Sequence, residues 1–340
     1  MRHPIFNIQT ESEFQAACLE TFRYQYENVE VYRKFADFLN INPSAVINVE
    51  QIPFLPIEMF KNHRVSDKNF EAQQYFQSSG TTQMKTFSRH FIADFALYEE
   101  SIYRSFSAFI GPPEDFVFLG LLPNYLERQN SSLIYMVDFL MKKSGKEENG
   151  YFLYNHEELL SLLGQLKGRK VILFGVSFAL LDFLDYCTTQ QATAVLQDAV
   201  TDDFSVIETG GMKGRKVEMT KDALLKILQN GFGTTRIFSE YSMTELLSQA
   251  YSLGDNIYKT PNWMRILIRN TEDPFAYMEP CRTGAINIID LANRHSCAFI
   301  ATQDMGRFQY EKGAQIKKIQ FEVLGRMDHS DIRGCSLLVS

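Results

Sequence analysis

Short apolar segments alternate with amphipathic ones between residues 116 and 238, and this alternation constrains the fold more than any other feature. The apolar runs are typical of strands buried on both faces, and the segments between them have helical spacing. Since parallel strands must be joined by crossovers, the pattern predicts a mostly parallel sheet with crossover helices. The expected strands are 116–122, 151–153, 171–176, 204–208 and 235–238, with helices at 131–143, 157–166, 178–186 and 221–228.

The two ends of the chain have a different texture. Residues 11–39 carry apolar side chains at helical spacing and predict one long helix, whereas 51–60 contains two prolines and predicts an extended apolar connection. Beyond residue 255 helix signals are few, and strands are expected at 263–268, 284–289, 297–301 and 316–323. The sequence therefore predicts an α/β core over residues 1–254 and a β-rich subdomain over 255–340 that ends in a hinge-like tail.

Composition excludes several classes of function. The chain has 340 residues and a formal net charge of −7, which gives no basic field for nucleic acid. It shows neither a secretory signal nor an apolar run near the ~18 residues of a spanning helix, so a cytoplasmic protein without a transmembrane segment is expected. Its five cysteines are scattered and its six histidines lack ligand spacing, so neither disulfides nor a structural zinc site is expected.

A hydroxyl-rich hexapeptide, 77–82, follows an extended stretch over 72–76. Its hydroxyl groups, and the backbone N–H groups that the turn at glycine leaves free, can donate hydrogen bonds to phosphate oxygens. The pattern therefore indicates a protein that uses ATP, with an ordinary surface turn as the alternative. The donors would come from Ser78, Ser79, Gly80, Thr81 and Thr82.

Two further segments come directly after expected strands. Gly210 and Gly211 end the first, and glycine there lets a flat ring lie against the backbone. The second, Glu-Tyr-Ser-Met-Thr-Glu at 240–245, offers an aromatic face for a purine, a hydroxyl for a phosphate and a carboxylate for Mg²⁺. Taken alone, the glycine pair could instead form a tight turn. The 240–245 segment could instead be a core tyrosine beside a surface glutamate.

The last two polar segments lie in the C-terminal part. Asp304, in Thr-Gln-Asp-Met-Gly at 302–306, is expected just past an apolar strand, where a carboxylate can accept hydrogen bonds from two ribose hydroxyls. A turn is the alternative. Gly-Arg-Met-Asp at 325–328 precedes Arg333 and is expected to form a polar hinge.

In this order the segments resemble the core motifs of the adenylate-forming superfamily, which includes acyl-CoA synthetases, firefly-type luciferases and peptide-synthetase adenylation domains. The matching stretches are 78–82, 209–211, 241–245, Asp304 and 325–328. Segments 56–61, 122–128 and 131–136 further resemble the LuxE-like acyl-protein synthetases of bacterial bioluminescence. The likeness to that family spans most of the chain.

The resemblance implies an enzyme that uses ATP and Mg²⁺ to activate a fatty or other carboxylic acid as acyl-AMP. It implies that the acyl group then passes to Cys335 as a thioester, and from there to a partner such as a reductase or a carrier protein. The implied contacts are Gly210, Gly211 and Tyr241 to adenine, Asp304 and Arg326 to ribose, the 78–82 loop to the phosphates, and Thr244 and Glu245 to the reacting groups, with Glu245 holding Mg²⁺.

The chain departs from larger members of the superfamily in two ways. Gln83 stands where they have glycine, and Lys85 is displaced from their lysine position. The chain also stops soon after Arg333, so the mobile C-terminal lid domain and its catalytic lysine are expected to be absent. Lys61, Lys85 and Arg128 are the candidates to supply that positive charge.

Other interpretations stay open. The acyl group could pass to coenzyme A or to a carrier-protein thiol, or the chain could be a nucleotide- or acyl-binding remnant without catalysis. Cys335 could instead be a small apolar residue of a terminal strand. Cys187 and Cys297 are expected to pack in the core, while His90, His156 and His329 are expected to cap helices or face solvent.

Overall fold

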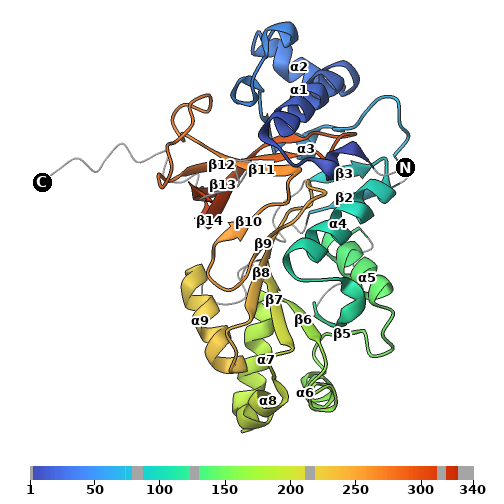
Figure 1. The fold of residues 1–340 in the computed structure, drawn as a ribbon, viewed down its shortest axis with the longest axis vertical. Coiled ribbons are helices and arrows are strands. Elements are labelled where there is room, and N and C mark those ends of the chain that lie inside the picture. The colour runs from blue at the N-terminus through green and yellow to red at the C-terminus, as the bar shows by residue number, and fades with distance from the viewer. Residues whose placement is uncertain are drawn as a thin grey trace, which may run out of the picture.

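The computed structural model describes residues 3–72, 74–78, 87–122, 130–210, 219–311 and 319–327. Within this part of the chain, the strands form one 12-stranded mixed sheet and a separate two-stranded sheet. The large sheet extends from one half of the elongated molecule into the other (Figure 1). One half holds its parallel strands, and the other holds antiparallel strands that carry the N-terminal helices.

The predicted parallel sheet is confirmed. It consists of β4 (Val117–Leu121), β5 (Gly150–Phe152), β6 (Val171–Val176), β7 (Phe204–Thr209) and β8 (Ile237–Tyr241). These strands lie in the order β8, β7, β6, β4, β5, and each is parallel to its neighbours. Every residue of β4, β6 and β7 is buried, which explains their unbroken apolar runs.

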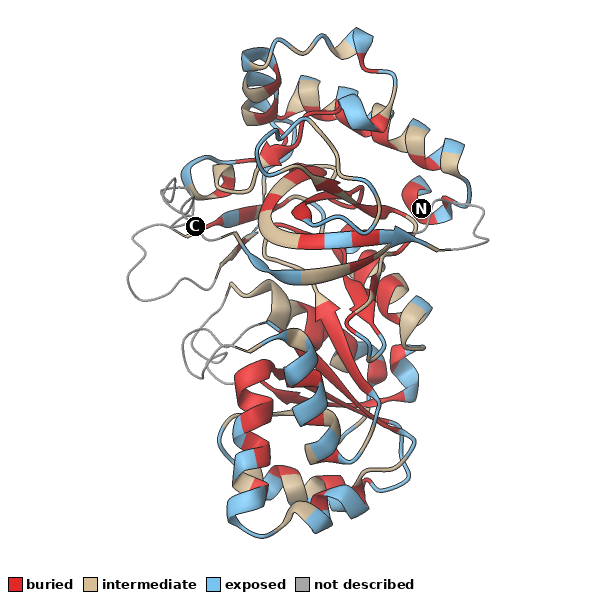
Figure 2. Ribbon diagram, turned by 90° about the vertical axis from the view of Figure 1, so that its left-hand side faces the viewer, coloured by how far each residue is buried: buried red, intermediate tan, exposed pale blue. Residues whose placement is uncertain are grey.

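Helices join these strands and cover the sheet. They are α5 (Ser132–Ser144), α6 (His156–Gln165), α7 (Ser177–Thr189), α8 (Thr193–Ala199) and α9 (Lys221–Phe232). Ser131 caps α5 as the sequence predicts, since its side chain accepts a hydrogen bond from the Ile134 N–H at 3.4 Å. The helices turn buried faces towards the strands and exposed faces outwards (Figure 2).

The C-terminal part is β-rich, as predicted, and continues the same sheet. Its strands are β9 (Ala250–Ser252), β10 (Tyr258–Lys259), β11 (Met264–Arg269), β12 (Gly284–Asp290), β13 (Phe299–Tyr310) and β14 (Ile319–Arg326). From β8 the order runs β9, β10, β14, β13, β12, β11, with antiparallel pairing throughout. The division of the chain at residue 254 stays a prediction.

The N-terminal part differs from its prediction in two respects. The single helix expected over 11–39 is wrong, because buried Val29 is extended and separates α1 (Glu11–Asn28) from α2 (Glu30–Phe38). Of the expected extended connection at 51–60, β1 (Leu55–Pro56) alone is a strand and pairs with β13, and α3 (Met59–Asn62) follows it. The remaining elements are β2 (Gln74–Gln77), β3 (Arg89–Ile92), α4 (Phe95–Phe109) and the 3-10 helices η1 (Pro4–Asn7), η2 (Pro43–Ala45), η3 (Val49–Gln51) and η4 (Pro113–Asp115).

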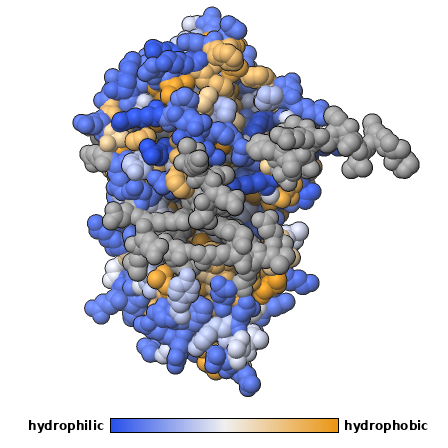
Figure 3. Space-filling model, turned by 180° about the vertical axis from the view of Figure 1, so that it is seen from behind, coloured by the Kyte–Doolittle hydropathy of each residue, from blue (hydrophilic) through white to orange (hydrophobic). Residues whose placement is uncertain are grey.

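One face of the molecule shows how polar and apolar side chains are distributed over the described residues. From behind, hydrophilic side chains predominate over both ends of the molecule, and the exposed hydrophobic ones form small groups (Figure 3). Scattered apolar side chains of this kind are normal on a folded protein. No helix in the described ranges combines the length and apolar character needed to cross a bilayer.

Candidate functional site

Strands β8 and β13 meet at Tyr241 and Asp304. The Tyr241 hydroxyl donates a hydrogen bond to Asp304 Oδ2 at 2.8 Å, although 63 residues separate the two in sequence. Arg326 lies opposite Asp304 in the register of β13 and β14, with its Nε 3.4 Å from Asp304 Oδ1. The Arg326 side chain is 84% exposed and that of Asp304 14%. The carboxylate is therefore held in place, while the guanidinium is largely solvated and adds little to its stability.

The setting of Asp304 corrects the sequence analysis. The strand expected to end at Ala301 continues to Tyr310, so Asp304 lies within β13 rather than beyond it. Gly325 and Arg326 end β14, and the hinge expected over 325–328 stays a prediction. The mixed polar sequence gave no strand signal, because backbone pairing with β12 and β14 maintains the strand where side-chain burial alone would not.

The Tyr241 ring packs at the end of β8 against two other aromatic rings. Its centroid lies 5.9 Å from that of Tyr258 and 5.7 Å from that of Phe321, both in edge-to-face geometry. Burial and the neighbouring Asp304 carboxylate raise the pKa of the Tyr241 hydroxyl well above its usual value. The hydroxyl therefore stays protonated and acts as the donor to Asp304.

Gly210 lies beside Tyr241. In the β7–β8 register Thr209 pairs with Glu240, so the next residue of each strand comes to the same edge of the sheet. The Thr209 hydroxyl donates to Glu240 Oε2 at 2.5 Å, and the Ser177 hydroxyl donates to the Gly210 carbonyl at 3.1 Å. Gly210 has a φ of 77°, a conformation that favours glycine. The expected contact of Tyr241 and Gly210 with one flat ring stays a prediction.

Glu245 connects this edge to the start of the hydroxyl-rich loop. Glu245 is 5% exposed, and its carboxylate interacts with the Ser88 hydroxyl. Ser88 and Ser78 are joined by two hydrogen bonds, Ser88 N–H to Ser78 Oγ at 3.0 Å and Ser78 N–H to the Ser88 carbonyl at 3.1 Å. Burial raises the pKa of Glu245, although the Ser88 hydroxyl and the positive charges of Lys61 and Arg326 oppose the shift. Lys61 is thus within electrostatic reach of Glu245.

His90 is a residue of this site whose place the sequence analysis missed. It was expected to cap a helix or face solvent, but it lies in β3, is fully buried, and packs edge-to-face against Phe60. Its Nδ1 lies 2.9 Å from the Thr244 carbonyl, and since a carbonyl can only accept, Nδ1–H is the donor. His90 thereby fixes the backbone immediately before Glu245.

The buried imidazole of His90 should make stability depend on pH. Burial lowers the pKa of His90 from 6.5 to about 4. Between pH 4 and pH 6.5 the imidazole is protonated in the unfolded chain and neutral in the folded one. The contribution of His90 to stability is therefore fully present above pH 6.5 and is lost as the pH falls towards 4. The shift corresponds to up to about 3 kcal/mol of unfolding free energy. Denaturant unfolding of wild type and of His90→Phe measures this effect. From pH 7 to pH 4 the unfolding free energy of wild type should fall by this amount relative to that of the variant. A difference between the two unfolding free energies that does not change with pH would refute the assignment.

The structure brings together the predicted site residues that it describes. Tyr241, Asp304 and Arg326 form one contact group, Gly210 lies beside Tyr241, and Glu245 links to Ser78 through Ser88. Thr244 contributes a carbonyl contact, while its predicted phosphate donation stays a prediction. Cys187 and Cys297 are buried, as expected. The remaining predicted residues, which lie outside the described ranges, are Ser79, Gly80, Thr81, Thr82, Lys85, Arg128, Gly211, His329 and Cys335.

The donor set around Glu245 suits one kind of metal ion. Across the described ranges, no group of three or more His, Cys, Asp or Glu side chains could enclose a metal. Glu245 offers a single carboxylate beside the Ser88 hydroxyl. Mg²⁺ in nucleotide sites usually keeps several waters and takes one or two carboxylates together with substrate phosphates. The residues therefore fit Mg²⁺ shared with a polyphosphate and do not fit a cage built of protein ligands alone.

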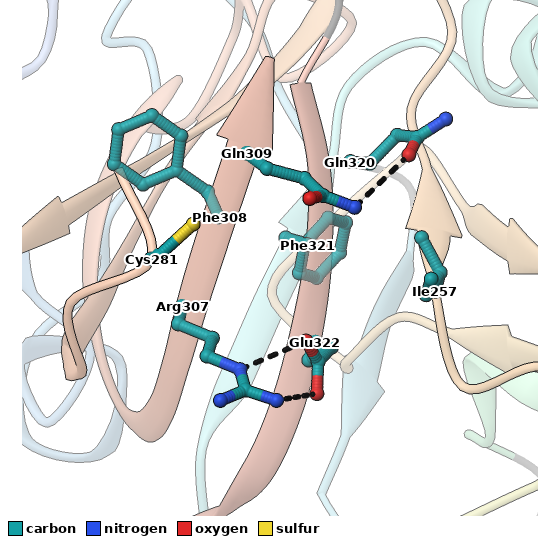
Figure 4. A pocket seen from close by; sticks show the side chains of 8 residues that line it. All are labelled: Ile257, Cys281, Arg307, Phe308, Gln309, Gln320, Phe321 and Glu322. Atoms are coloured by element: carbon teal, nitrogen blue, oxygen red, sulfur yellow. Dashed lines mark hydrogen bonds and ion pairs between the residues drawn. The ribbon is translucent and has the colours of Figure 1, made fainter. Parts of the chain in front are cut away.

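A separate pocket of about 210 Å³ lies on the β13–β14 hairpin (Figure 4). Phe321 is one of its lining residues and also packs against Tyr241, and Arg307 forms an ion pair with Glu322 at 2.8 Å in its lower part. Cys281, at the side of the pocket, is exposed, unlike the other three cysteines that the structure describes. The volume is below the ~300–1,000 Å³ usual for small-molecule sites, so this pocket is not the expected nucleotide site.

Known proteins provide a family context for this geometry. Residues 6–94 match the family model described as acyl-protein synthetase, LuxE. A sequence comparison with curated proteins finds no match. The family match covers the N-terminal helices, the whole hydroxyl-rich segment 77–82 and His90.

Solved structures share the fold over most of the chain. A 2-hydroxyisobutyryl-CoA ligase in complex with 2-HIB-AMP and CoA aligns with a TM-score of 0.72 and 11% identity, over 94% of this chain and 68% of that chain. ATP-bound MatB from Rhodopseudomonas palustris aligns with a TM-score of 0.52 and 13% identity, over 74% of this chain and 47% of its own. The luciferase-like enzyme of the nonluminescent mealworm Zophobas morio gives 0.50 and 13%, over 85% and 62%. The family model matches LuxE-type acyl-protein synthetases over residues 6–94, and the solved adenylate-forming enzymes share the fold.

Proposed function

We propose that this chain, which resembles the LuxE acyl-protein synthetases and has the adenylate-forming fold, activates a carboxylic acid with ATP and transfers the acyl group to a cysteine. The observation that carries the proposal is the 2.8 Å hydrogen bond between Tyr241 and Asp304. It joins two separate motifs at the edge of the sheet where Gly210 also lies. Ligands of open α/β sheets bind beyond the carboxyl ends of parallel strands, which is where β7 and β8 end.

The nucleoside would bind across this edge. Adenine would lie between the Gly210–Gly211 turn and the face of Tyr241, where an aromatic ring and a bare backbone accept a flat base. Asp304, held by the Tyr241 hydroxyl, would accept hydrogen bonds from the ribose hydroxyls. Arg326 is exposed enough to move onto the ribose without breaking a buried contact.

The phosphates would extend from the ribose towards Glu245 and the hydroxyl-rich loop. Ser78, Ser79, Thr81, Thr82 and Thr244 would donate hydrogen bonds to their oxygens. Glu245 would share Mg²⁺ with them, and the ion would supply charge neutralisation between two anions that must meet. Lys61, within electrostatic reach of Glu245, is the described member of the three cations considered for this task.

In the first step an oxygen of the acid attacks the α-phosphorus, the bond to the pyrophosphate oxygen breaks, and acyl-AMP forms. Positioning and electrostatics supply most of the catalysis in reactions of this type. In the second step a thiolate attacks the acyl carbonyl, and AMP leaves with its oxygen. Cys335 is the proposed thiol, with a fatty acid as the substrate and a reductase or carrier protein as the later acceptor.

Replacing Cys335 with serine should abolish covalent acyl labelling of the chain while preserving ATP–pyrophosphate exchange. The thiolate is needed only for the second step, because serine is a far weaker nucleophile at neutral pH. Intact-mass measurement after incubation with ATP, Mg²⁺ and a panel of carboxylic acids reports the label, and exchange of labelled pyrophosphate into ATP reports the first step. The matched control is Cys281→Ser, which removes an exposed cysteine and should retain the label.

Three results would contradict parts of the proposal. A label that persists in Cys335→Ser and vanishes in Cys281→Ser would identify Cys281 as the acyl acceptor in place of Cys335. A wild type that exchanges pyrophosphate but acylates only added coenzyme A would favour a CoA ligase. ATP binding without exchange for any acid would leave a nucleotide-binding protein without adenylation.

A further inference from the structure

A buried ion pair lies directly beneath the Gly210 turn and outside the predicted set of site residues. The Glu208 carboxylate, at the end of β7, is fully buried and forms an ion pair with Lys221 Nζ at the first residue of α9. The Ser177 hydroxyl lies within hydrogen-bond distance of both the Glu208 carboxylate and the Gly210 carbonyl and shares its one proton between them. Glu208 is thus connected to the Gly210 carbonyl through one hydroxyl group.

The same ammonium reaches the aromatic side of the candidate site. Lys221 interacts with the Tyr258 hydroxyl as well as with Glu208. The Tyr258 ring packs edge-to-face on Tyr241 at 5.9 Å and lies 5.4 Å from Phe321. Lys221 therefore bridges the two sides between which a base would lie, the Gly210 turn and the Tyr241 ring.

The partners of Lys221 keep its amino group protonated. Burial alone lowers the pKa of Lys221, but the attraction of Glu208 and Tyr258 outweighs burial and leaves the pKa above its usual value. The ammonium is charged at neutral pH and makes hydrogen bonds with fixed directions. A buried ion pair is weak evidence for stability, since well-packed apolar residues often serve as well. What the pair adds here is a fixed geometry between two motifs.

We propose that Lys221 is a positioning residue for the nucleotide base, acting through Tyr258 on Tyr241 and through Glu208 and Ser177 on the Gly210 turn. The inference rests on the proposed function, because Lys221 would fix the distance between the Gly210 turn and the Tyr241 ring at the proposed adenine site. Lys221 does not touch the reacting carboxylate or phosphorus. Its removal should therefore weaken nucleotide binding and leave the chemical step nearly intact.

The experiment uses the full-length protein and four variants. Lys221→Met removes the bridge, Tyr258→Phe removes one hydroxyl and keeps the ring, and Glu208→Gln with Lys221→Met removes both charges so that none is left buried alone. The matched control is Lys259→Met, which breaks the partly exposed pair with Glu311 at 2.9 Å on the residue next to Tyr258. Readouts are the KM for ATP and kcat in pyrophosphate exchange, the dissociation constant for AMP by calorimetry, and the thermal midpoint.

Lys221→Met and Tyr258→Phe should raise the KM for ATP and the AMP dissociation constant about tenfold, with kcat within about threefold of wild type. The double variant should recover the thermal midpoint lost in Lys221→Met without recovering AMP affinity, a split that a merely structural role would not produce. Lys259→Met should match wild type in all readouts.

Four outcomes decide between this inference and the proposed function. Wild-type exchange with unchanged ATP and AMP affinity in Lys221→Met and Tyr258→Phe overturns the inference alone. Affinity that returns together with stability in the double variant also overturns it. Wild-type AMP binding that the variants weaken, without exchange for any acid, overturns the proposed function alone. A wild type that binds neither AMP nor ATP overturns both.

Discussion

Replacing Asp304 with alanine is expected to lower kcat/KM for ATP in pyrophosphate exchange by roughly 100-fold or more, since a charge-assisted hydrogen bond contributes about 1.5–3 kcal/mol and the ribose would make two. The Asp304 side chain is held by the Tyr241 hydroxyl and is largely shielded from solvent. The loss should fall mainly on the KM for ATP, because in the proposed site the carboxylate would contact the ribose and not the reacting phosphorus.

Two variants control for indirect effects at Asp304. Tyr241→Phe keeps the ring and removes the donor to Asp304, and since a hydrogen bond to a charged carboxylate contributes about 1.5–3 kcal/mol, a loss of roughly tenfold is expected. Arg326→Met removes a largely exposed partner at 3.4 Å and should cost less still. An Asp304→Ala enzyme whose KM for ATP stays within about threefold of wild type would exclude the ribose role.

Replacing Asp290 with alanine is expected to lower the unfolding free energy by at least about 3 kcal/mol, because each buried N–H group left without an acceptor costs about 1–3 kcal/mol. Asp290, at the end of β12, is fully buried. Its carboxylate accepts from Leu247 N–H at 2.7 Å, Ser248 N–H at 3.0 Å, Ala292 N–H at 3.1 Å and Ser248 Oγ at 2.6 Å. Since residues 247 and 248 lie two and three positions after Glu245, Asp290 anchors the backbone next to that motif.

Chemical denaturation checks this prediction against a surface aspartate. Asp255 accepts from Ile257 N–H at 3.1 Å and Ser252 Oγ at 3.2 Å in an exposed turn, and Asp255→Ala should cost less than about 1 kcal/mol. The same aspartate-to-alanine change should thus lower the unfolding free energy strongly at position 290 and only slightly at position 255. Equal, small losses in both variants would show that Asp290 does not anchor the loop.

The parallel half of the sheet could be predicted from the sequence because its signal is local. Strands such as β6 are apolar along their whole length, and the helices between them start at capping residues such as Ser131. The break at Val29 and the polar continuation of β13 could not be predicted. Both depend on partners far along the chain, and single-residue propensity does not register those contacts.

The candidate site likewise contains residues that could be identified from the sequence and residues that could not. Tyr241, Glu245 and Asp304 belong to motifs whose order marks the superfamily, so the sequence identified them before any contact was known. His90 and Lys221 carry no motif of their own. Their importance arises from contacts with Thr244 and Glu208 that only the folded chain makes. A single histidine or lysine in sequence has too many ordinary explanations to be singled out.

The most direct test is a crystal structure of the protein with a stable acyl-AMP analogue. The proposal predicts the adenine ring between Gly210 and the face of Tyr241, the ribose hydroxyls on the Asp304 carboxylate, and the phosphate near Thr244 and Ser78. Nucleotide bound at any other surface, with these residues in contact only with each other, would contradict it.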